Sequence, residues 1–242
     1  MAKSALVTGG SRGIGAAVVS RLAQDGLDVA FTYAKSPDAA DAVAEEVQQL
    51  GRRGIAIKAD SETADAVRSA VDQAATELGR LDVLVCNAGI LAPGSIQDYP
   101  IETFDRMDAV NVRSVFCAIQ AAARVMTGGG RMIVIGSIVG ARTGFPGVSI
   151  YGMTKAAVSA LVRGAAIDLA PRAITVNTVA PGPTITDMNP ADGPMADRIR
   201  GLLPLGRMAR ASEIANLVSF LAGPESAFIT GATLTIDGGA SA

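Results

Sequence analysis

The first fifteen residues place a glycine-rich turn between a strand and a helix. Residues 4–7 form a short apolar run typical of a buried strand, and residues 8–15 follow it at once with repeated glycines. Ile14, Val18 and Leu22 then recur at helical spacing. The backbone N–H groups at the start of such a helix favour an anion. A glycine cluster is often only a turn, but this position after the first strand predicts a dinucleotide site.

The glycines of this turn have separate predicted purposes. Gly9 permits a tight turn, while Gly13 and Gly15 let the chain approach a pyrophosphate and let the helix pack closely on the sheet. The predicted cofactor-binding residues of the turn are Gly9, Ser11, Arg12, Gly13, Ile14 and Gly15.

Short β-rich segments alternate with helical patterns along the chain. This rhythm predicts an α/β fold in which a parallel sheet carries helices on both faces. The predicted strands are 4–8, 28–33, 54–59, 81–86, 131–137, 173–179 and 232–236. The predicted helices are 12–25, 38–50, 62–78, 102–126, 151–170 and 211–222. Residues 1–242 are expected to form one doubly wound domain, in which the proline-spaced segment 183–205 closes over substrate as a lid.

A second pattern indicates chemistry. Tyr151 and Lys155 are four residues apart in a predicted helix, which puts a phenol and an ammonium on one face, one turn apart. The ammonium favours the phenolate, so we expect the pKa of Tyr151 to lie below its usual value of about 10. Two exposed helix residues give the same spacing by chance, so the pair is informative only together with the other motifs.

Composition fits a compact enzyme and argues against several classes of function. Hydrophobic residues make up 49% of 242 positions, and the formal net charge of −2 offers no basic surface to nucleic acid or to an anionic membrane. The lack of histidine excludes a Ser-His triad and an ordinary zinc-histidine site. Cys86 and Cys117 are interpreted as buried free thiols, so no metal is expected. Without a leader or an apolar run of membrane-spanning length, the expected location is the cytosol.

Further motifs follow the glycine-rich turn in a fixed order. They are Asn87-Ala88-Gly89 after a buried strand, Asn111, Ser137, Tyr151 with Lys155, and the segment 181–186. Together they resemble the classical short-chain dehydrogenases and reductases over nearly the whole chain. The closing segment 206–239 looks like the branch that includes bacterial 3-oxoacyl-carrier-protein reductases and many carbonyl reductases. The resemblance implies a Rossmann fold of seven parallel strands in the order 3-2-1-4-5-6-7, with a dinucleotide across their carboxyl ends.

The resemblance also implies roles in the reduction of a small-molecule carbonyl substrate. Ser137 would hydrogen-bond the carbonyl oxygen, Tyr151 would protonate it, and Lys155 would bind the nicotinamide ribose. Asn111 would hold a water that links Lys155 to solvent, although an amide satisfied by the backbone is the alternative. Asp60 and Ser61 would lie near the adenine or, equally well, cap the next helix. The other implied cofactor contacts are Asn87, Ala88, Gly89, Pro181, Gly182, Thr184 and Thr186.

The end of the second predicted strand distinguishes NAD from NADP. An acidic residue there would accept the ribose hydroxyls of NAD, but Tyr33 stands about where that acid is expected. Arg12 and Lys35, with Ser36 beside them, favour a 2′-phosphate instead. We therefore expect NADP(H) as the cofactor.

Departures from the family pattern leave the substrate open. Cys86 replaces a common asparagine, and thirteen residues separate Ser137 from Tyr151 where twelve are commoner. Only Arg124, Arg131 and Arg172 stand where a carrier-protein reductase has its basic patch. A carbonyl reductase for a small ketone is therefore the leading hypothesis. Reduction of a 3-oxoacyl group on acyl carrier protein is second, and a nucleotide-binding regulator without catalysis is third.

The resemblance finally implies a homotetramer. Small apolar residues in the helices predicted at 102–126 and 151–170 permit close contact between helices, and these are Ala121, Ala122, Ala157 and Ala165. The alternative is that the alanines pack on the chain's own sheet.

Overall fold

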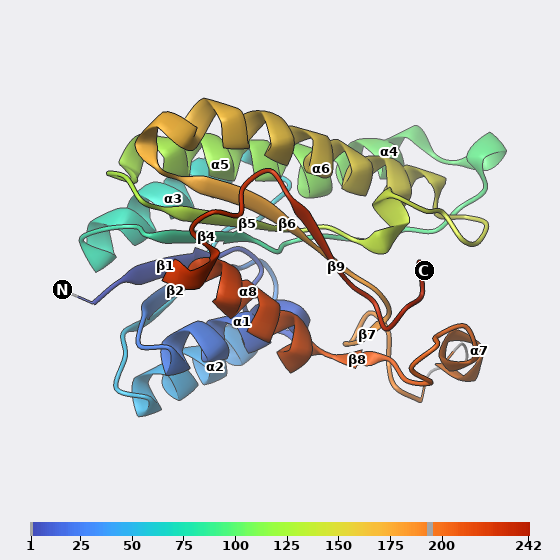
Figure 1. Cartoon of the computed structure of the whole chain (residues 1–242), viewed down its shortest axis with the longest axis horizontal. Coiled ribbons are helices and arrows are strands. Elements are labelled where there is room, and N and C mark those ends of the chain that lie inside the picture. Colours follow the sequence, from blue (N-terminus) through green and yellow to red (C-terminus); the bar gives the residue numbers. More distant parts are fainter. Residues whose placement is uncertain (1, 193–195) are drawn as a thin grey trace.

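Seven parallel strands form the central sheet of the computed structural model, which describes residues 2–192 and 196–242. Their order is β3-β2-β1-β4-β5-β6-β9 (Figure 1). The strands are β1 (Ser4–Val7), β2 (Asp28–Tyr33), β3 (Gly54–Lys58), β4 (Val83–Cys86), β5 (Arg131–Ile135), β6 (Thr175–Pro181) and β9 (Thr233–Ile236). This confirms the predicted doubly wound sheet and its strand order.

Helices cover both faces of the sheet (Figure 1). One face carries α1 (Gly13–Gln24), α2 (Pro37–Gln49) and α8 (Ala211–Ala222), which bury a core around Phe31 and Val18. The other face carries α3 (Ala64–Leu78), α5 (Ser114–Val125) and α6 (Ser149–Leu169), which bury a second core around Leu84 and Val158. Because both faces are covered, the central strands are apolar at nearly every position, as expected for parallel strands.

The strand order reverses next to β1. This strand pairs with β2 on one side and with β4 on the other, and the chain reaches β4 only after passing through β3. Loops that leave the carboxyl ends of β1 and β4 therefore turn to opposite sides, and in doubly wound sheets the ligand crevice lies between two such loops. The glycine-rich turn and the Asn87 loop border this crevice.

The long helix predicted at 102–126 is wrong in one respect. The structure has α4 (Ile101–Asp108), one π-helical turn (Ala109–Arg113) and then α5. Asn111 lies in the middle of that turn. The apolar pattern runs through all three pieces, so periodicity alone does not reveal the extra residue that a π turn accommodates. The other predicted boundaries are within two residues of those observed, and α6 begins at Ser149 rather than at Tyr151.

The segment predicted as a lid contains regular structure that the sequence pattern does not indicate. It begins with β7 (Thr184–Ile185), which pairs with β8 (Ala209–Arg210), and it includes the short helix α7 (Ala196–Gly201). Residues 193–195 of the predicted lid lie outside the described residues. Figure 1 shows these elements at one end of the molecule, on the side where β9 ends.

The part of the chain that the structure describes also contains four single turns of 3-10 helix: Ile96–Asp98, Ile138–Gly140, Ala170–Arg172 and Pro224–Ser226. Within residues 2–192 and 196–242, no helix combines the length and the apolar character needed to cross a bilayer.

Candidate active site

The glycine-rich turn has a conformation that only glycine fits well. Gly9 and Gly13 have positive φ angles of 66° and 56°. Gly15 has no room for a side chain, because an added Cβ would lie 2.1 Å from the carbonyl oxygen of Gly9. The Gly9 N–H donates to the Thr32 hydroxyl oxygen at 2.9 Å, which ties the turn to β2. The turn is therefore tied to β2 at the N-terminus of α1, where the sequence predicts a pyrophosphate.

Asn87 and Ala88 hold this turn in place. The Asn87 amide Nδ2 donates to the carbonyl oxygens of Thr8, at 3.0 Å, and Gly9, at 2.9 Å. The Ala88 N–H donates to the Thr8 hydroxyl oxygen at 3.1 Å. The sequence predicted direct cofactor contacts for both residues. Their polar groups shape the walls of the crevice.

Lys155 and Tyr151 lie together on the first turns of α6. The Lys155 ammonium nitrogen is 5.6 Å from the centroid of the Tyr151 ring. Lys155 is buried, and its Nζ donates to the carbonyl oxygen of Ile135, the last residue of β5, at 2.9 Å. Burial disfavours the charged form and lowers the pKa of Lys155 to about 8. The bond to β5 thus keeps the Lys155 ammonium near the Tyr151 ring.

The pKa of Tyr151 is raised, so the expectation of a lowered value is wrong for this geometry. Burial of the phenol is the larger cause, and a hydrogen bond with the Ser137 hydroxyl opposes it. Ser137 follows β5 and also accepts a hydrogen bond from the Val139 N–H at 3.2 Å, which starts the turn Ile138–Gly140. The end of β5 and the start of α6 therefore bring Ser137, Tyr151 and Lys155 together.

Asn111 connects the π turn to the loop after β4. Its Oδ1 accepts from the Ile90 N–H, and its Nδ2 donates to the Ile90 carbonyl oxygen, both at 2.9 Å. The same Nδ2 lies 3.1 Å from the Thr154 hydroxyl of α6. The Asn111 amide thus has partners on the loop after β4 and on α6, and its role in holding a water stays a prediction. This side chain keeps the loop at Gly89 close to Lys155, where a Cβ on Gly89 would lie 3.5 Å from the ammonium nitrogen.

The base of the predicted lid touches the glycine-rich turn. A Cβ on Gly13 would lie 3.3 Å from the Thr186 methyl group, and the Arg12 guanidinium is 3.9 Å from the Asp187 carboxylate. Thr184, in β7, is buried, and its hydroxyl donates to the Gly182 carbonyl oxygen at 3.0 Å. The segment 181–186 thus lies beside the crevice, as the motif order predicted.

At the other end of the crevice, Asp60 and Ser61 do not cap α3. That helix begins at Ala64 with Thr63 at its N-cap position. Asp60 instead accepts a hydrogen bond from the Glu62 N–H at 3.0 Å, which turns the chain after β3. Tyr33, at the end of β2, is half-buried, and Lys35 after it is exposed.

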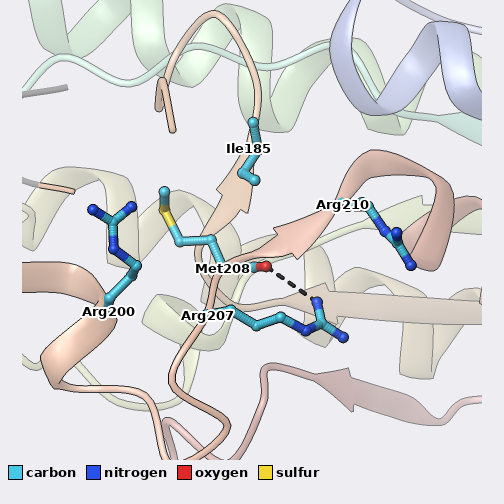
Figure 2. A pocket seen from close by; sticks show the side chains of 5 residues that line it. All are labelled: Ile185, Arg200, Arg207, Met208 and Arg210. Atoms are coloured by element: carbon cyan, nitrogen blue, oxygen red, sulfur yellow. Dashed lines mark hydrogen bonds between the residues drawn. The ribbon is translucent and has the colours of Figure 1, made fainter. Parts of the chain in front are cut away.

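Two hollows lie near the proposed site, one at the base of the predicted lid and one at the start of α6. The first, of about 340 Å³, is at the outer base of the predicted lid and is lined by Ile185, Arg200, Arg207, Met208 and Arg210. Figure 2 shows Met208 at its centre, with Arg200 on one side and both other arginines on the opposite side. Arg207 donates to the Met208 carbonyl oxygen, and its guanidinium pairs with Glu213 at 2.7 Å. The guanidinium groups do not converge. Arg207 and Arg210 both lie near the Glu213 carboxylate, which links β8 to α8.

The second hollow, of about 540 Å³, separates the loop after β4 from the segment before α6. Its lining residues are Pro93, Gly94, Ser95, Ile96, Pro146, Gly147 and Ser149. The Gly94 N–H donates to the Gly147 carbonyl oxygen at 2.9 Å, which joins the two walls. One of its lining residues, Ser149, is two residues before Tyr151 on α6. The sequence indicated only that the segment between Ser137 and Tyr151 has an unusual length.

Among the described residues, no group of three or more histidine, cysteine, aspartate or glutamate side chains is arranged to hold a metal ion. Cys86 and Cys117 are buried free thiols, and burial raises the pKa of Cys86 to about 12.

Comparison with known proteins agrees with this geometry. A family model described as enoyl-(acyl carrier protein) reductase matches residues 9–241. The chain is 44% identical over 236 residues to a cyclic-di-GMP-binding biofilm dispersal mediator protein from Escherichia coli, an alignment that covers 98% of this chain and 96% of that protein. It is 40% identical over 242 residues to a 3-oxoacyl-(acyl-carrier-protein) reductase from Staphylococcus aureus, covering 99% and 98%.

Among solved structures, a short-chain dehydrogenase from Burkholderia cenocepacia in complex with NADP superposes with a TM-score of 0.98 at 52% identity, covering 99% of this chain and 98% of that one. The motif order, the strand order and these similarities agree over nearly the full length. The chain therefore belongs to the classical short-chain dehydrogenase/reductase family of oxidoreductases.

Proposed function

We propose that this protein reduces a small or medium-sized ketone to a secondary alcohol with NADPH. The observation that carries the proposal is the grouping of Ser137, Tyr151 and Lys155 where β5 ends and α6 begins. The glycine-rich turn, which fits a pyrophosphate, borders the same crevice. The proposal thus joins a proton donor to a site for a hydride-carrying cofactor.

The raised pKa of Tyr151 suits an acid rather than a base. A phenol whose pKa is raised stays protonated at neutral pH and can give its proton to the substrate oxygen as negative charge develops there. Ser137 donates a hydrogen bond to the same oxygen. NADPH, when bound, supplies the hydride for the carbonyl carbon.

Lys155 stabilises the phenolate that remains after proton transfer. Its pKa of about 8 leaves the side chain mostly charged at neutral pH, and its nitrogen lies 5.6 Å from the tyrosine ring centroid. The bond to the Ile135 carbonyl oxygen keeps the ammonium in that position. Lys155 would also contact the nicotinamide ribose, and Thr184 and Thr186 at the lid base would hold the carboxamide.

Charges at the adenosine end favour NADP(H) over NAD(H). Arg12 and Lys35 are exposed cations, and Tyr33 takes the place of the carboxylate that would bind free ribose hydroxyls. The Burkholderia cenocepacia structure, similar over nearly its whole length, is a complex with NADP. We expect kcat/KM for NADPH to exceed that for NADH by about tenfold or more, equivalent to about 1.4 kcal/mol.

Acyl-carrier-protein substrates are the second candidate because one relative is a 3-oxoacyl-(acyl-carrier-protein) reductase. Two of the three arginines expected in a basic patch are otherwise engaged. Arg131 donates to the carbonyl oxygens of Gly129 and Gly130, and Arg172 donates to those of Ala123 and Met126. These contacts hold both side chains on the loop after α5, so fewer of their N–H groups are free to bind the acidic groups of a carrier. We therefore favour a free ketone.

A regulator that binds a nucleotide is the third candidate. It is motivated by the relative named as a cyclic-di-GMP-binding protein. Titration of cyclic-di-GMP into the protein by calorimetry, with and without saturating NADPH, tests it. Binding without any ketone reduction would favour this candidate over the enzyme.

We further propose that the protein is a homotetramer assembled through α5 and α6. Phe116 on α5 and Met153 and Ile167 on α6 expose large apolar side chains that nothing in the chain covers within the described residues. The alanines that motivated this expectation mostly serve the chain's own core: Ala121, Ala122 and Ala165 are buried there. The exposed side chains of Phe116, Met153 and Ile167 therefore support the proposed tetramer better than the alanines do.

The test of the enzymatic proposal is a Tyr151→Phe variant assayed for NADPH oxidation. A panel of ketoesters, diketones, cyclic ketones, acetoacetyl thioesters and an enoyl thioester separates ketone reduction from carrier-type and enoyl substrates. Loss of the phenolic proton should reduce kcat by about a hundredfold or more and leave NADPH binding nearly intact. A variant that keeps most of its ketone reduction would refute Tyr151 as the acid.

A further inference from the structure

Lys58 is the last residue of β3, and its side chain is exposed. Its Cα partner on the neighbouring strand is Tyr33, the last residue of β2. Paired residues on parallel strands present their side chains to the same face of a sheet. Two residues earlier, Phe31 and its partner Ala56 both pack in the core beneath α1 and α2. Tyr33 and Lys58 therefore continue that face at the carboxyl end of the sheet.

The direction of α2 places its first turn at the same height along the strands as Lys58. Gly54, at the start of β3, lies against the carboxyl half of the helix, since a Cβ there would be 2.7 Å from the Ala44 carbonyl oxygen. Four residues of strand from Gly54 to Lys58 span about 13 Å, which corresponds to about nine residues of helix. Counting back from Ala44 along α2 reaches the residues just before Pro37. Lys58 is thus level with the N-terminus of α2.

That helix end is suited to an anion. Ser36 is at the N-cap position but its side chain makes no capping hydrogen bond, and the first backbone N–H groups of a helix have no partner within it. Lys35 precedes it and is exposed, while Asp38 in the first turn is the opposing charge. In the described part of the chain, no carboxylate lies within 4.0 Å of the Lys35 or Lys58 ammonium.

We propose that Lys58 binds the 2′-phosphate of NADP(H) and acts with Lys35 and Arg12 to select it over NAD(H). The inference rests on the proposed cofactor and adds a residue from a different strand to its recognition. Arg12 is the N-cap residue of α1 and Ser36 that of α2, and both helices cover the face to which Lys58 belongs. The three cations thus come from three segments at the carboxyl edge of this face, where the 2′-phosphate dianion would gain charge-assisted hydrogen bonds.

The test compares dissociation constants for NADPH and NADH, measured by the fluorescence of the bound reduced nicotinamide. Lys58→Ala should weaken NADPH by about tenfold and NADH by less than twofold, because only NADPH carries the 2′-phosphate. Lys58→Arg should restore most of the loss. Competition by 2′,5′-ADP should fall in parallel, while competition by 5′-AMP should not change.

Arg53→Ala is the matched control. Arg53 is an exposed cation immediately before the other end of β3, so its removal changes the net charge equally but far from the proposed phosphate. It should leave both dissociation constants unchanged. Thermal unfolding midpoints identify any variant that is merely misfolded, and Lys58→Gln, which keeps a long polar side chain, replaces Lys58→Ala if that variant does not fold.

The outcomes separate this inference from the proposed function. Equal weakening of NADPH and NADH, or no change in either, overturns the role of Lys58 while Arg12→Ala still reports on the cofactor choice. A wild-type protein that binds both cofactors equally overturns the 2′-phosphate site altogether.

Discussion

The side chain of Asn111 makes hydrogen bonds with both backbone polar groups of Ile90, the N–H and the carbonyl oxygen. The two hydrogen bonds, both 2.9 Å long, join a π turn to a loop that lies 21 residues earlier in the chain. Asn111 is almost completely buried, so water does not replace these bonds easily. The loop so fixed forms one wall of the crevice next to Lys155.

Asn111→Ala should therefore lower the free energy of unfolding by about 1–3 kcal/mol, because it leaves backbone groups of Ile90 without partners. Urea denaturation measures this loss. Asn216→Ala is the control, since Asn216 is exposed on α8 and its loss should cost less than about 0.5 kcal/mol. Equal, small effects of both substitutions would contradict a clamping role for Asn111.

Gly15→Ala should abolish cofactor binding or the fold of the turn. The new methyl group would lie 2.1 Å from the Gly9 carbonyl oxygen and 2.5 Å from the Asn87 amide nitrogen, so the turn must move. Gly201→Ala, where an added Cβ meets nothing within 4 Å, should bind NADPH as wild type does. Calorimetric titration with NADPH distinguishes the two variants. Normal affinity in Gly15→Ala would show that the turn does not receive the pyrophosphate.

Because of Lys155, the free energy of unfolding should change with pH in the alkaline range. Its folded-state pKa of about 8 lies below the ordinary value of 10.5, so between these values the unfolded chain binds more protons than the folded one. The contribution of Lys155 to the free energy of unfolding therefore rises as pH increases through that window. Below pH 8, where the buried side chain is charged in the folded state, its burial is most destabilising. Measurements should stop short of pH 10, where the raised pKa of Tyr151 begins to act in the opposite direction.

The comparison variant is Lys155→Met, which keeps a long side chain without a charge. Urea unfolding at pH 7 and 9.5 should show wild type gaining about 1–2 kcal/mol relative to this variant. A difference that does not change with pH would mean that the lysine is not significantly desolvated.

Ile167→Arg should dissociate the proposed tetramer. The Ile167 side chain on α6 is 76% exposed in the single chain, and a charge placed in an apolar contact is costly to bury. Light scattering should change from about four times the chain mass of 24.5 kDa to a smaller species. Leu50→Arg, at a leucine that is 42% exposed beyond the end of α2, should not alter the mass. A wild-type protein that is monomeric at micromolar concentration would refute the assembly.

Local patterns were sufficient for most of the fold. The turn from Gly9 to Gly15 and the alternation of strands with helices depend on residues close in sequence, so they are visible without a structure. The interruption of the predicted helix 102–126 was not visible, because a π turn keeps nearly the same apolar periodicity. Strands β7 and β8 were also missed, since two-residue strands have no periodicity to detect.

By itself, the sequence determined the class of chemistry: a glycine-rich turn after the first strand, a tyrosine and a lysine one helical turn apart, and no histidine to support another mechanism. The tertiary structure decided how those groups behave. Burial, which depends on elements distant in sequence, raises the pKa of Tyr151 and lowers that of Lys155. Strand register brings Lys58 beside Tyr33, 25 positions away in the chain. Desolvation and register are properties of the packed chain, so no local pattern of residues contains them.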